Sequence, residues 1–71
     1  MAHMKIKERR DDHGNIWWSL NGNFHREDGP AIIYENGTVS WALNGKYYNP
    51  EEMPLSLYLA YLKWELNKKE K

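Results

Sequence analysis

The segment His25-Arg26-Glu27-Asp28 is the one part of this chain whose residue types could perform chemistry. A histidine beside two carboxylates can exchange protons or bind a metal ion. These side chains would have to converge, but neighbouring residues of a strand point to opposite faces. The chain has no cysteine, and no second histidine completes a ligand set. We therefore expect local ion pairs and a turn here, and we expect no enzymatic activity, cofactor or metal site.

Two copies of one hairpin pattern, offset by 23 residues, surround this segment. Residues 14–24 read GNIWWSLNGNF, and residues 37–47 read GTVSWALNGKY. In both copies, apolar residues at every second position predict a strand with one buried face. An Asn-Gly pair follows, which favours the type I′ turn that joins two twisted strands. The sequence therefore predicts an antiparallel β-meander over residues 4–48, with two hairpin repeats and about five to six strands.

A change of hydrophobic period predicts a C-terminal helix over residues 49–71. Asn49 and Pro50 suit the N-cap and the first helical position, and Pro54 is either tolerated or splits off one short turn. Leucines at helical spacing are expected to cover one face of the sheet: Leu55, Leu59, Leu62 and Leu66. The sheet residues expected beneath them are Ile16, Trp18, Leu20, Val39, Trp41 and Leu43. The predicted fold class is α+β, with the helix packed on one face of the sheet and the other face open.

Length and charge limit the range of functions. A chain of 71 residues allows a single domain, which we assign to residues 4–71 because residues 1–3 are typical of a cloning remnant. No apolar run approaches the ~18–20 residues of a membrane span, so we expect no membrane partner. Ten Lys and Arg residues balance ten Asp and Glu residues, which disfavours nucleic acid as a partner.

A family resemblance lies in the connecting motif. Residues 20–31 read LNGNFHREDGPA, and residues 41–46 read WALNGK. This pattern resembles MORN-like repeats of the "NGK-x-HREDGPA" variety found in small bacteriophage and bacterial proteins. The resemblance covers roughly residues 12–48 and implies a hairpin array used as a scaffold or binding surface, without a common catalytic role. The second copy departs from the motif, since residues 48–53 read YNPEEM, so we expect the array to end there with the helix as its cap.

Trp17 is the leading candidate for a partner-binding residue. Alternation turns it away from Trp18, toward the sheet face that the helix is not expected to cover. There it either packs with Ile32 or Ile33 or anchors a partner, because Trp and Tyr are favoured in binding hot spots. The expected partner-binding residues are Trp17, Ile33, Arg26 and Tyr48.

Charge is distributed unevenly along the chain. Lys5–Arg10 holds four basic residues and one acidic residue, whereas residues 11–52 hold two basic and seven acidic ones. A basic edge strand discourages unwanted strand pairing, and we prefer this interpretation. In the alternative, its cations meet phosphate while aromatic rings stack on a base. The candidate phosphate-binding residues are Lys5, Lys7, Arg9 and Arg10.

The leading functional hypothesis is a non-enzymatic, phage-encoded binding module. It would bind and inhibit a protein of the bacterial host, such as a defence or nucleic-acid-processing enzyme, in the host cytoplasm. One alternative is a protein that sequesters a nucleotide or another small ligand. The other is a structural homodimer joined through the open sheet face.

Overall fold

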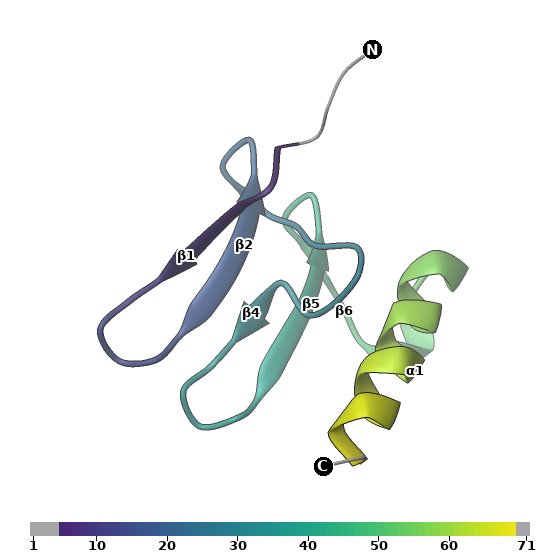
Figure 1. The fold of residues 1–71 in the computed structure, drawn as a ribbon. Coiled ribbons are helices and arrows are strands. Elements are labelled where there is room, and N and C mark those ends of the chain that lie inside the picture. The colour runs from purple at the N-terminus through teal and green to yellow at the C-terminus, as the bar shows by residue number, and fades with distance from the viewer. Residues whose placement is uncertain (1–4, 70–71) are drawn as a thin grey trace.

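A computed structural model describes residues 5–69 as a twisted six-stranded sheet with one C-terminal helix (Figure 1). The strands are β1 (Lys7–Arg10), β2 (Ile16–Leu20), β3 (Asn23–Phe24), β4 (Ile32–Ile33), β5 (Val39–Leu43) and β6 (Lys46–Tyr48). All pairings are antiparallel, which confirms the predicted α+β meander. Residues 1–3, the expected cloning remnant, lie outside the described residues.

Both hairpin turns have the backbone that Asn-Gly pairs favour. The φ angles are 53° at Asn21 and 83° at Gly22, and they are 51° at Asn44 and 84° at Gly45. Positive φ at both central positions is the mark of a type I′ turn, whose twist matches the right-handed twist of its strands. The turns β2–β3 and β5–β6 are therefore equivalent in geometry as well as in sequence.

The 23-residue offset also holds in the pairing of the strands. Arg9 of β1 pairs with Trp17 of β2, and the residues 23 positions later, Ile32 of β4 and Ser40 of β5, also pair. The pairings within the two hairpins coincide under the same offset. Strands β1–β3 and β4–β6 are thus two copies of one three-stranded unit, joined where β2 pairs with β4.

Pro54 splits off one short turn from the C-terminal helix, which is one of the two outcomes predicted for it. A 3-10 turn, η1 (Pro50–Glu52), comes first, and helix α1 (Leu55–Lys69) begins directly after the proline. The carbonyl of Pro54 accepts the N–H of Tyr58 at 2.9 Å, so the proline supports the first turn of α1 without needing an N–H of its own. Among the described residues, no helix has the length and apolar character needed to cross a membrane.

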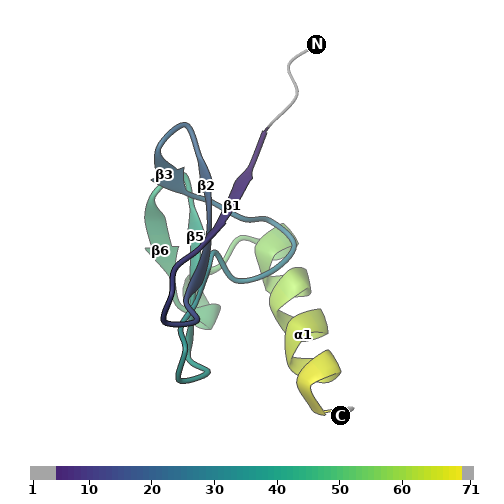
Figure 2. The ribbon, with the colours of Figure 1, turned by 60° about the vertical axis from the view of Figure 1, so that its left-hand side comes forward.

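Helix α1 stands on one side of the sheet (Figure 2), but the face it turns to the sheet is not the predicted one. The four leucines predicted to cover the sheet are exposed: Leu55 (73%), Leu59 (56%), Leu62 (45%) and Leu66 (59%). The buried side of α1 carries Leu57, which is 1% exposed, and Tyr61, whose ring meets Trp41 edge-on at 5.8 Å. An aromatic ring buries more area than a leucine and gains from edge-to-face contact, which favours this orientation of the helix.

Each face of the sheet has its own apolar layer. Trp41 faces Tyr61 of α1, so its neighbour in β5, Ala42, points to the opposite face. There Ala42 and Ile32 are buried together with Ala31. Trp17 and Phe24 are packed against this cluster. The most buried cluster of the sheet therefore lies on the face away from α1, which we call the open face.

Candidate functional site

His25 holds the two copies of the repeat together. Its side chain is 4% exposed, and its Nδ1 accepts the backbone N–H of Asn44 in the second copy at 3.0 Å. Because Nδ1 is the acceptor, the ring proton of the neutral histidine is on Nε2, which lies 3.0 Å from a carboxylate oxygen of Glu27. Both ring nitrogens are thus engaged, and the contact of this neutral ring with Glu27 is a hydrogen bond. The ion pair predicted for this segment is formed by Arg26 and Asp28, whose charged groups are 2.9 Å apart.

Arg26 is committed to the loop of residues 25–31. Its guanidinium lies 3.9 Å from the centre of the Trp18 ring, donates from Nε to Asp28 at 2.9 Å, and donates from Nη1 to the Pro30 carbonyl at 3.2 Å. A Cβ added at Gly29 would come within 2.7 Å of the same guanidinium, so the loop closes tightly around it. These contacts stabilise the connection between the copies, and the predicted role of Arg26 in binding a partner stays a prediction.

An apolar pocket opens on the open face of the sheet. It measures about 270 Å³ and is lined by Asp11, Asn15, Trp17, Phe24, Ile32 and Tyr34. Trp17 is half-buried, because one side of its ring packs on the buried cluster. Trp17 therefore packs on the core, as one of its two interpretations predicts, and also lines the pocket, while its role as an anchor for a partner stays a prediction.

The polar rim of this pocket is rigid. The carboxylate of Asp11 accepts the backbone N–H of His13 at 2.9 Å and of Asn15 at 3.0 Å, and the Asn15 side-chain amide donates to it at 2.9 Å. The bond from that amide is the largest of the effects that lower the pKa of Asp11 below its ordinary value. Asn15 in turn accepts the N–H of Glu35 at 2.8 Å, which ties the turn between β1 and β2 to the turn between β4 and β5.

Basic residues of β1 border the pocket on the same face. Arg9 pairs with Trp17 and Lys7 pairs with Ser19, so both side chains share the face of Trp17. Lys5 precedes the strand and is exposed. Arg10 lies on the α1 side of the sheet, where its guanidinium is 2.9 Å from the carboxylate of Glu8. The four candidate phosphate-binding residues are therefore not one cluster, and only Lys7 and Arg9 are placed beside the pocket.

The predicted partner-binding residues likewise divide between the two faces. Trp17 lies on the open face, whereas Ile33 pairs with Ile16 and Val39 on the α1 side. The neighbour of Trp17 is Ile32, because a shift of one residue in a strand moves every side chain to the other face. Tyr48 pairs with Trp41 and shares its face. The open-face site thus retains Trp17 from the predicted set.

The sequence-based prediction missed the two other aromatic residues that line the pocket, Phe24 and Tyr34. A two-residue turn at Asn21-Gly22 fixes Ser19 opposite Phe24, and Ser19 lies on the face of Trp17 by alternation. Phe24 could therefore have been assigned from the turn alone. Tyr34 follows β4 and offers no such signal, since its position depends on how β4 pairs with β2.

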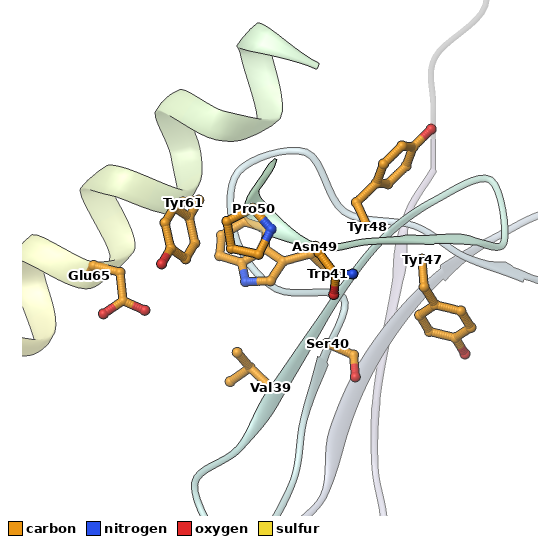
Figure 3. Close-up of a pocket in the computed structure, with 9 residues that line it drawn as sticks. All are labelled: Val39, Ser40, Trp41, Tyr47, Tyr48, Asn49, Pro50, Tyr61 and Glu65. Carbon is orange, nitrogen blue, oxygen red and sulfur yellow. The ribbon is translucent and has the colours of Figure 1, made fainter. Parts of the chain in front are cut away.

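Strand β6 pairs with residues 41–43 of β5, so the edge of β5 at Val39 and Ser40 is free on that side. A second hollow, of about 340 Å³, lies between this free edge and helix α1 (Figure 3). Its lining residues are Val39, Ser40, Trp41, Tyr47, Tyr48, Asn49, Pro50, Tyr61 and Glu65. In the first copy, the corresponding edge of β2 pairs with β4. Residues 23 positions after β4 begin α1, so within the described residues no strand continues the array here. The hollow marks the end of the array, and η1 and α1 cap it.

Neither surface contains a site for a metal ion. Among residues 5–69, no three His, Cys, Asp or Glu side chains gather closely enough to hold one.

Comparison with known proteins adds nothing to the geometry. No protein-family model, curated protein or solved structure matches this chain.

Proposed function

We propose that this protein is a non-catalytic binding module that engages a partner protein through its open face. The observation that supports the proposal is the apolar pocket between Trp17, Phe24, Ile32 and Tyr34, bordered by the basic strand β1. Aromatic rings around an apolar hollow, with charge at the rim, are the usual arrangement of a protein-binding hot spot. The resemblance to MORN-like phage proteins supports a host bacterial protein as the partner.

The binding mode follows from the placement of these groups. An apolar side chain of the partner fills the pocket and covers the exposed side of Trp17. Carboxylates of the partner approach Lys7 and Arg9, whose charges fix the orientation of the complex. The hydrogen-bonded turns beneath the pocket hold its shape before binding, so little ordering is required. Inhibition of the partner would then be steric, by coverage of a surface that it needs.

A second candidate function is the binding of a nucleotide or a single-stranded nucleic acid. One observation favours it, namely that Arg9 and Trp17 are cross-strand neighbours on the same face. A base stacked on the indole would place its phosphate near the guanidinium. The partner protein remains the leading proposal because the rest of the pocket is apolar and the net charge of the chain is zero.

Binding to a host protein is tested with matched variants. Immobilised protein is exposed to nuclease-treated bacterial lysate, and proteins retained at near-equal stoichiometry are identified by mass spectrometry and then titrated by calorimetry. Arg9→Glu changes a charge on the open face, and Arg10→Glu changes the next charge on the opposite face. Tyr34→Ala opens the pocket at a residue that is itself exposed.

We expect Arg9→Glu and Tyr34→Ala to weaken binding at least tenfold, and Arg10→Glu to leave it within about twofold of the wild type. Equal affinity of all three variants would exclude the open face as the binding surface. If no protein is retained, fluorescence titration of the tryptophans with a nucleotide panel and with single-stranded oligonucleotides decides the second candidate. Quenching that Arg9→Glu abolishes would replace the partner protein with a phosphate ligand.

A further inference from the structure

Helix α1 carries a second apolar face that the sheet does not use. Leu57 and Tyr61 are turned to the sheet, while four other leucines lie between 45% and 73% exposed. These four leucines, which we call the leucine seam, are Leu55, Leu59, Leu62 and Leu66. On a short helix of a small protein, four exposed leucines along one line are not the usual surface. We therefore ask which surface covers the leucine seam.

The spacing of the seam is that of a helix-pairing surface. The leucines follow one another by four, three and four residues, which is the alternation of the a and d positions of a coiled coil. The residue opposite the seam on the helix is Leu57, which is fully buried in the protein's own core. The helix thus has two distinct apolar sides, one of which is satisfied within the chain.

The seam is symmetric about the midpoint between Leu59 and Leu62. Reversing the direction of the helix reproduces the same spacing of the same residue, so the surface is complementary to itself under a two-fold rotation. Self-complementarity is what a two-fold interface between identical chains requires. We propose that a second copy of this chain covers the seam, with the two α1 helices antiparallel. Leu55 then packs on the partner's Leu66, and Leu59 on the partner's Leu62.

The residues that flank the seam fit this arrangement. In an antiparallel pair with this register, Tyr58 lies beside the partner's Glu65, and Ser56 lies beside the partner's Lys63. Tyr58 is partly exposed and stacks on Tyr61 with ring centres 5.8 Å apart, so its ring is already held at the border of the seam. No flanking position opposes two like charges. The residues that flank the leucine seam are therefore compatible with an antiparallel pair of α1 helices.

The size of the seam sets the strength of the dimer. The exposed leucines amount to on the order of 400 Å² per chain, which lies within the range of functional apolar patches. A helix pair of this size falls below the ~1,200–2,000 Å² that stable complexes bury in total. We therefore expect a dimer that dissociates in the micromolar range. Small chains with thin cores commonly gain stability from such association.

Dimerisation through α1 leaves the open face of each copy free, because α1 and the open face lie on opposite sides of the sheet (Figure 2). A dimer would therefore present two binding faces. This inference does not rest on the proposed function, since the seam and the open-face pocket have no residue in common.

Sedimentation equilibrium from about 1 µM to 1 mM protein measures the association. We expect a monomer–dimer equilibrium for the wild type and monomer alone for the double variant Leu59→Glu/Leu62→Glu. Tyr47→Glu is the matched control, because Tyr47 is 53% exposed on the open face, and it should dimerise as the wild type does. Circular dichroism establishes that each variant is folded. A wild type that is monomeric throughout, or a double variant that still dimerises, would overturn the proposal.

Cross-linking tests the antiparallel direction. The chain has no cysteine, so single introduced cysteines are unique. An equimolar mixture of Leu55→Cys and Leu66→Cys should oxidise mainly to the mixed disulfide, while either variant alone should cross-link poorly. Efficient cross-linking of Leu55→Cys with itself would show parallel helices and would contradict the antiparallel pairing of α1.

Discussion

After the equivalent aromatic residues of the two hairpins, Phe24 in β3 and Tyr47 in β6, the chain takes two different courses. In the first copy it enters the loop of residues 25–31, in which Arg26 lies on Trp18 and the N–H of Trp18 donates to the carbonyl of Ala31 at 2.8 Å. That loop delivers the chain to β4, where the second copy begins. In the second copy it enters η1 and then α1.

The difference shows that the hairpin and its continuation are specified separately. Both hairpins have the same turn geometry and the same strand register. The equivalents of His25 and Arg26 in the second copy are Tyr48 and Asn49, which cannot reproduce the contacts to Asn44 and Trp18. The residues that follow each hairpin therefore determine whether another repeat comes next. The hairpin residues determine only the structure of the repeat itself.

The largest expected loss of stability comes from a substitution in helix α1, which caps the second copy. Leu57→Ala removes a fully buried side chain, and we expect a loss of ~3 kcal/mol in the free energy of unfolding. Leu59→Ala, two residues further along the same helix, should cost less than ~0.5 kcal/mol because that side chain is exposed. Urea unfolding of both variants at equal, low protein concentration measures the difference. Equal losses would mean that the leucine seam, and not Leu57, attaches α1 to the sheet.

The second effect concerns the connection between the copies. His25→Leu keeps a side chain of similar size but leaves the N–H of Asn44 without its acceptor, so we expect a loss of ~2 kcal/mol. Tyr48→Leu changes the equivalent position of the second copy, where no third copy is attached, and should cost less than ~1 kcal/mol. Hydrogen exchange of the Asn44 amide gives a local measure. Unchanged protection of that amide in His25→Leu would contradict the role assigned to the histidine.

The elements that the sequence predicts well are those set by local rules. Asn-Gly turns and period-two alternation define both hairpins without knowledge of the rest of the chain. The orientation of α1 cannot be predicted in this way, since Leu57 and Tyr61 also lie at helical spacing, on a face other than that of the leucine seam. Only the geometry of the sheet, with Trp41 placed to meet Tyr61, selects between the two faces.

The binding site was predictable in part for the same reason. Alternation places Trp17 on the open face whatever its partners are. Whether Ile32 or Ile33 lies beside Trp17 depends on the register of β4 against β2. Two adjacent isoleucines form no pattern from which that register can be predicted. The contact between the Arg26 guanidinium and the Trp18 ring depends on how the loop of residues 25–31 folds back on β2, which no local pattern predicts.

A third, smaller effect separates the two equivalent turns. Gly22→Ala and Gly45→Ala each place a Cβ at positive φ, which costs about 1 kcal/mol. At Gly22 the new Cβ meets nothing within 4 Å, whereas at Gly45 it comes within 3.3 Å of the Asn23 side chain. Gly45→Ala should therefore destabilise more than Gly22→Ala, by a few tenths of a kcal/mol to ~1 kcal/mol. Thermal unfolding under identical conditions makes the comparison, and the reverse order would show that the two turns do not pack as their positions imply.

The smallest effect lies in the turn that opens the first copy. Asp11 accepts three hydrogen bonds in this turn. Tyr34 occupies the equivalent position of the second copy and does not replace this set of bonds. In that turn the side chain of Asn36 accepts the N–H of Thr38. The bonds to Asp11 lower its pKa below the ordinary value, with the hydrogen bond from the Asn15 side-chain amide as the main cause. A lowered pKa means that the ionised carboxylate adds stability above its ordinary pKa and that this stability disappears as the pH falls through the lower, folded-state value.

Asp11→Asn should therefore be less stable than the wild type at pH 6, and the two should converge as the pH falls below about 4, the ordinary pKa of a carboxyl group. Asn36→Asp is the matched variant in the second copy, and it adds an ionisable acceptor where the native turn uses a neutral one. Unfolding midpoints measured across this range report the convergence. A difference between wild type and Asp11→Asn that stays constant down to pH 2 would mean that the turn depends on the shape of the side chain and not on its charge.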